Sequence, residues 1–165
     1  MTDDRSVDDN LVEIYLSDHA AAAAAMTRRV RRMADAYDRE LAEAMGALAD
    51  ALERERDWIL SVMAARQLTL SRWKTAATVV GERVGRLKRN GRSFRQSPLS
   101  PLLELELLGS GLRGKRSGWR TLREWSTELQ LDTDQLNGLL ADVERQIDQV
   151  EELLVTQRRK ALRRT

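Results

Sequence analysis

The chain has 165 residues, which favours one domain and is long enough to bury a substantial core. It has no cysteine, which excludes disulfides and thiolate chemistry. Its 28 basic and 26 acidic residues leave a net charge of +2, and a balance so close to neutral does not by itself indicate nucleic-acid binding. The only prolines are Pro98 and Pro101, so little else in the sequence must interrupt a helix.

The first helix is predicted to follow an acidic N-terminus. Residues 1–9 are polar, and we expect them to be disordered ahead of a single domain at residues 10–165. Asn10 and Glu13 have the spacing of a capping box, which predicts a helix from about Leu11 to Tyr37. Its core-facing positions recur at alternating intervals of four and three residues. They are Val12, Leu16, His19, Ala23, Met26, Val30, Met33 and Tyr37.

A second helix is predicted from about Arg39 to Arg66. Neither glycine nor proline separates it from the first helix, so one continuous helix in an extended coiled coil is an alternative. We favour a turn at residues 36–38, because a helix of more than about 50 residues would be unusual in a domain of this size. The core-facing positions of the second helix are Leu41, Met45, Leu48, Leu52, Glu55, Ile59 and Val62.

A long connection follows, and residues 72–89 within it predict a fifth, shorter helix with Ser71 as its cap. Its apolar face is typical of a helix that covers a bundle, and we favour a solvated role for its basic face. The alternative is contact with nucleic acid or an anionic membrane through a basic patch at residues 83–95. The basic residues of that patch are Arg83, Arg86, Lys88, Arg89, Arg92 and Arg95.

Two further long helices complete the predicted order. Ser97-Pro98 and Ser100-Pro101 both have the pattern of a helix start, and that helix should run to about Leu129. Asp132 should cap the last helix, which ends in the basic segment RRKALRRT. The sequence therefore predicts an all-α four-helix bundle.

This order resembles the ferritin-like four-helix bundle, in which one long crossover joins two helical hairpins. The segments LVEIYLSDH and SPLSPLLELELL also resemble those of small uncharacterised actinobacterial helical proteins. Ferritin-like di-iron sites need a Glu-x-x-His pair on each of two helices. This chain has one histidine, His19, with Leu16 three residues before it. The resemblance thus implies the fold without the di-iron site, and we expect no metal and no cofactor.

Polar residues at core-facing positions predict a polar layer across the bundle. In an antiparallel hairpin, His19 and Glu55 would lie about one turn apart, and Lys115 takes the equivalent position on the third helix. Three interpretations stay open: a ligand pocket or former metal site, a paired network that fixes helix register, or side chains that reach solvent. On the fourth helix, the carboxylates at a similar height are Glu144, Asp148 and Glu151.

The segment GSGLRGKR, from Gly109 to Arg116, nearly matches the phosphate-binding loop G-x-x-x-x-G-K-[ST]. Arg116 cannot supply the hydroxyl that holds magnesium in such loops, and the leucines before it continue a helical period. We therefore interpret the segment as a helix whose small residues either let a neighbouring helix approach or allow a local kink.

The functional prediction is a non-catalytic, cytoplasmic binding or structural protein that acts through its helix faces. A homodimer is one form it could take, with Trp58 or Trp73 at the interface, because tryptophans often anchor interfaces. The alternatives are the basic module described above and a carboxylate-rich site for a metal or small ligand in the core. The longest apolar run, Ala20–Met26, is too short to span a bilayer.

Overall fold

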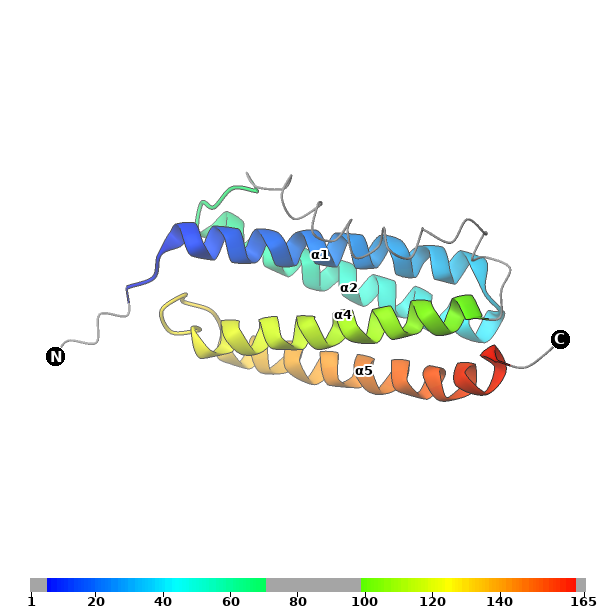
Figure 1. Cartoon of the computed structure of the whole chain (residues 1–165). Helices are drawn as coiled ribbons and strands as arrows, with labels where there is room; N and C mark the ends of the chain where they lie inside the picture. Colours follow the sequence, from blue (N-terminus) through cyan, green and yellow to red (C-terminus); the bar gives the residue numbers. More distant parts are fainter. Residues whose placement is uncertain (1–5, 71–98, 163–165) are drawn as a thin grey trace.

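The computed structural model describes residues 6–70 and 99–162, and this part of the chain contains four long helices and no strand. Helices α1 (Asp9–Ala36) and α2 (Arg39–Ala65) form one antiparallel hairpin. Helices α4 (Leu99–Glu124) and α5 (Thr133–Ala161) form the other, and the two hairpins pack against each other (Figure 1). The prediction of an all-α bundle is confirmed. The predicted crossover, its fifth helix and the basic patch lie outside the described residues.

Contacts between the hairpins define how the helices run. Helix α1 lies beside α4 in the opposite direction, and α2 lies beside α5. Helices α2 and α4 run in the same direction, so the last described residue after α2 and the first residue of α4 lie at opposite ends of the bundle (Figure 1). Each hairpin therefore presents one broad face to the other, and the core lies between these faces.

Helix starts are set by aspartates. Asp8 caps α1, because its Oδ1 accepts from the backbone N–H groups of Asn10 at 2.9 Å and Leu11 at 3.3 Å. The predicted cap at Asn10 is therefore wrong. A carboxylate two residues earlier satisfies the same end of the helix and complements its dipole. The helix thus begins inside the segment predicted to be disordered.

The turn between α1 and α2 consists of Tyr37 and Asp38. Asp38 accepts from the backbone N–H of Leu41 at 3.2 Å and so begins a new helix. The predicted turn is confirmed, and the alternative of one continuous helix is wrong. At the other hairpin, Asp132 caps α5 as predicted.

Two details of the third predicted helix differ from expectation. Ser100 lies inside α4, which is already helical at Leu99, so the second of its two predicted starts is wrong. The earlier candidate, Ser97-Pro98, lies outside the described residues. The regular helix ends at Glu124, and turns continue to Gln130.

A glutamine in the left-handed backbone conformation follows the end of α2, and another ends the turns after α4. Gln67 has φ 57° and Gln130 has φ 55°. The next backbone N–H reaches back to an unpaired carbonyl in each case, from Leu68 to Met63 at 2.9 Å and from Leu131 to Ser126 at 2.8 Å. This is the Schellman arrangement, in which glycine is the usual left-handed residue.

The core consists largely of the predicted positions, with one shift on α1. Ala20 and Ala24 are buried on α1, whereas Ala23 is half-buried. His19, Ala23 and Met26 in the middle of the predicted pattern are half-buried, whereas Leu16, Val30 and Met33 are buried. The largest fully buried side chains include Leu16, Met33, Met45, Leu52, Leu105, Leu108, Leu112, Trp119 and Leu136.

Two glycines let α1 approach α4. A Cβ at Gly118 would lie 2.5 Å from Nε2 of His19, and a Cβ at Gly111 would clash with the end of Met26. The glycines are one heptad apart and face α1. The segment that resembles a phosphate-binding loop is therefore continuous helix within α4, with small residues at a helix contact, as interpreted from the sequence.

We expect Gln130→Gly to raise the free energy of unfolding by about 0.5–1 kcal/mol. A left-handed conformation costs an L-residue about 1–2 kcal/mol, part of which is offset by the greater freedom of glycine in the unfolded chain. Urea unfolding measures the change. The control is Gln149→Gly on the exposed side of α5, which should destabilise by about 1 kcal/mol. Equal destabilisation by both variants would contradict the expectation.

Candidate functional site

Three polar side chains meet between the hairpins: Glu55 on α2, Lys115 on α4 and Gln146 on α5. Lys115 Nζ forms an ion pair with Glu55 Oε2 and donates a hydrogen bond to Gln146 Oε1. Gln146 Nε2 donates to Glu55 Oε1 at 2.8 Å. The three side chains form a closed ring of contacts that joins one hairpin to the other. We call them the polar triad.

The polar triad is buried. Glu55 is 6% exposed and Gln146 is 8% exposed, and the side chain of Lys115 is 14% exposed. Charges in such surroundings lose their hydration, and removing one partner leaves the other charge buried and uncompensated. Glu55 and Lys115 therefore depend on each other for compensation of their charges.

Burial also lowers the pKa of Lys115 below the 10.5 of a solvated lysine. The carboxylates of Glu55 and Asp142 act in the opposite direction, because negative charge favours the ammonium form. Loss of hydration is the larger effect, so the folded protein holds this proton less tightly than the unfolded chain does.

The predicted polar layer is thus partly present. Glu55 and Lys115 come together as the sequence indicated, whereas His19 lies elsewhere. Its Nδ1 lies 2.9 Å from the carbonyl oxygen of Tyr15, its ring lies 4.3 Å from that of Tyr15, and its Nε2 side packs on Gly118. Because the core face of α1 has rotated towards Ala20, His19 reaches the α1–α4 contact instead of the triad.

The predicted carboxylates on α5 also lie elsewhere. Glu144 reaches Arg116 at 3.1 Å and Arg120 at 3.6 Å on the surface, and Asp148 is exposed. Glu151 pairs with Arg113 at 2.8 Å, and this hydrogen bond lowers the pKa of its carboxyl group.

Gln146 was not predicted from the sequence, because the predicted polar layer included only carboxylates on the fourth helix. Residues two apart on a helix point to opposite sides, so a buried Gln146 requires Glu144 and Asp148 to face outward. The available signal was spacing: Gln146 follows Val143 by three residues and precedes Val150 by four, as a core position should.

A pocket of about 190 Å³ lies between α2 and α5 and is open to solvent. Glu55 belongs to its lining, so the pocket lies next to one member of the polar triad. The indole of Trp58 forms another part of the lining and packs edge-on against the buried Trp119, with ring centroids 5.5 Å apart. The remaining lining residues are Ala51 and Arg54 on α2, and Gln135, Leu139 and Asp142 on α5.

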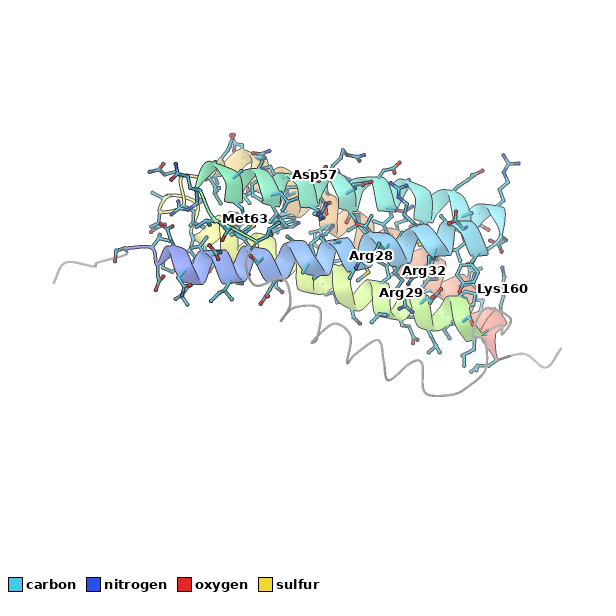
Figure 2. All side chains as sticks on the ribbon, turned by 90° about the horizontal axis from the view of Figure 1, so that it is seen from above. Arg28, Arg29, Arg32, Asp57, Met63 and Lys160 are labelled. Atoms are coloured by element: carbon cyan, nitrogen blue, oxygen red, sulfur yellow. The ribbon has the colours of Figure 1, made fainter. Side chains whose placement is uncertain are left out.

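Several basic residues lie on the second half of α1 and near the close of α5. Figure 2 shows Arg28, Arg29 and Arg32 on the second half of α1, and Lys160 towards the same end near the close of α5. Arg29 is paired with Glu104 at 3.3 Å, whereas Arg28 and Arg32 are exposed. The basic patch predicted at residues 83–95 lies outside the described residues.

Within residues 6–70 and 99–162, no three His, Asp or Glu side chains converge as a metal ion would require. No helix in the same part of the chain has the length and apolar character needed to cross a membrane. In comparisons with known proteins, no family model, no curated protein and no solved structure matches this chain.

The lowered pKa of Lys115 predicts a pH-dependent stability. Between the folded-state pKa and 10.5 the unfolded chain binds more protons, so the free energy of unfolding rises with pH in that window. The double variant Glu55→Leu, Lys115→Met lacks both buried charges and should lack this rise. Urea unfolding from neutral pH to pH 10.5 measures both proteins. A difference between them that stays flat or shrinks as the pH rises would contradict the expectation.

Proposed function

We propose that this protein is a non-catalytic helical-bundle protein that binds a second copy of itself. In this proposal the fold is ferritin-like without the di-iron ligands, and the polar triad has a structural role. Support for that role comes from the closed ring of contacts, in which Glu55, Lys115 and Gln146 satisfy one another across the two hairpins. The chain has no cysteine, which is in keeping with the cytoplasm as its compartment.

The observation that carries the proposal is an exposed tryptophan, Trp125, at one end of the bundle. Trp125 is 42% exposed, and the same end carries Leu11 at 62% and Leu70 at 40%. We call these three residues the apolar end. It forms where the start of α1, the end of α2 and the turns after α4 meet (Figure 1).

Arg66 ties these segments together. Its guanidinium binds Asp9 at 2.5 Å at the start of α1 and donates to the carbonyl of Leu129 at 3.3 Å. Arg66 therefore holds together the three segments that carry the apolar end.

Large apolar side chains at a surface favour a contact that removes them from water. Tryptophan is among the residues that contribute most to binding energy when an interface buries them. Trp58, which the sequence suggested for this role, is partly exposed and packs against the buried Trp119. Trp73, the other candidate, lies outside the described residues.

A second copy is the occupant we propose, because two-fold homodimers are the commonest oligomers and bring the same surface of each chain together. The sequence-based alternative, contact of residues 83–95 with nucleic acid or an anionic membrane, stays a prediction.

We expect Trp125→Ser to weaken dimerisation by about tenfold or more, since truncating a central interface tryptophan commonly costs at least 1.4 kcal/mol, which is about a tenfold change. Leu11→Ser should weaken it less. Sedimentation velocity over a range of concentrations measures the effect. The matched control is Val155→Ser, because Val155 is 47% exposed on α5 and lies away from the apolar end. A chain that is monomeric at every concentration, or a dimer insensitive to Trp125→Ser, would overturn the proposal.

A further inference from the structure

We propose that the pocket between α2 and α5 is a binding site for a small organic cation with an apolar body. Its lining combines the buried carboxylate of Glu55, the carboxylate of Asp142 and the indole of Trp58. This site is separate from the apolar end, and its ligand does not depend on dimerisation.

Glu55 has room to accept a further hydrogen bond. An ionised carboxylate accepts about four hydrogen bonds, two on each oxygen. In the polar triad, Oε2 receives Lys115 and Oε1 receives Gln146. Each oxygen therefore keeps acceptor capacity, and Glu55 is part of the pocket lining. A ligand ammonium group at Glu55 would share the carboxylate with the ammonium of Lys115, so Asp142 has to supply the further negative charge.

The pocket lining includes two carboxylate residues and one arginine, and the carboxylate of Glu55 is already paired with Lys115. Asp142 carries a second negative charge, and its field reaches far enough into the bundle to favour the protonated form of Lys115. Asp142 also pairs with Arg145, which is three residues along α5 and exposed to solvent. Such a surface pair is weak, so Asp142 can also attract a ligand at the pocket.

The apolar lining matches the body of such a ligand. The face of an indole attracts cations more strongly than any other aromatic side chain, and Leu139 and Ala51 add apolar contact. The packing of Trp58 against Trp119 holds the indole in place. A water molecule occupies about 30 Å³ in the liquid, so a pocket of about 190 Å³ holds a group of roughly six to eight non-hydrogen atoms. Benzylammonium is of this size.

Arg54 distinguishes a cation site from an anion site. It is exposed and also lines the pocket, so its positive charge opposes a bound cation and would assist a bound anion. Arg54→Ala should therefore tighten the binding of a cation and weaken the binding of an anion.

The test uses benzylamine at neutral pH, where it is protonated, with neutral benzyl alcohol as a probe of the same shape. Backbone amide NMR shifts locate the site and give the affinity. We expect a saturable response at Ala51 and Leu139, with benzylamine binding more tightly than benzyl alcohol. Asp142→Asn should weaken benzylamine by about two- to fivefold, as the loss of a partly exposed ion pair does, and Arg54→Ala should strengthen it.

Glu144→Gln is the control, because Glu144 lies on the same helix but pairs with Arg116 outside the pocket. It should leave the affinity for benzylamine unchanged. Asp142→Asn and Arg54→Ala do not touch the core, so the test does not depend on changing Glu55. Equal affinity for the two probes, the absence of a saturable shift at the pocket, or weaker benzylamine binding in Arg54→Ala would overturn the proposal.

Discussion

The ion pair between Glu55 and Lys115 joins α2 of one hairpin to α4 of the other through a carboxylate that is only 6% exposed. Leucine, methionine and valine layers pack almost as well if one hairpin slides along the other by a heptad. Such a slide would separate the two buried charges, and an uncompensated charge in a protein interior is strongly destabilising. The pair, completed by Gln146, therefore selects one register for α2 against α4 and α5.

The surface features follow from that register. It aligns the ends of the helices so that Arg66 can reach both Asp9 and the carbonyl of Leu129, and the apolar end forms around this junction. The same register sets Glu55 beside the gap between α2 and α5, where Trp58 and Leu139 complete a pocket. Glu55 thus belongs both to the polar triad in the core and to the lining of the pocket.

Most of the fold could be predicted because helix periodicity and capping are local. Spacing of three and four residues located the helices, and Asp132 was recognised as a cap. The first cap was missed because Asp8 and Asn10 are both good caps, and only the packing of α1 decides between them.

The site was predicted in part: Glu55 and Lys115 stood out as charges at apolar positions. Gln146 carries no charge, so its part in the polar triad was not predicted. The displacement of His19 depends on the rotation of α1 towards α4, which Gly118 allows and periodicity alone does not reveal.

A double-mutant cycle on Glu55 and Lys115 tests the role of the ion pair most directly. Free energies of unfolding are measured for Glu55→Leu, Lys115→Met and the double variant. Each single change should cost about 3–5 kcal/mol, because it leaves one charge buried without its partner, and the double variant should be far more stable than the sum of these costs implies. Two nearly neutral single changes with additive effects would contradict the account, since the charges would then not be coupled in the core.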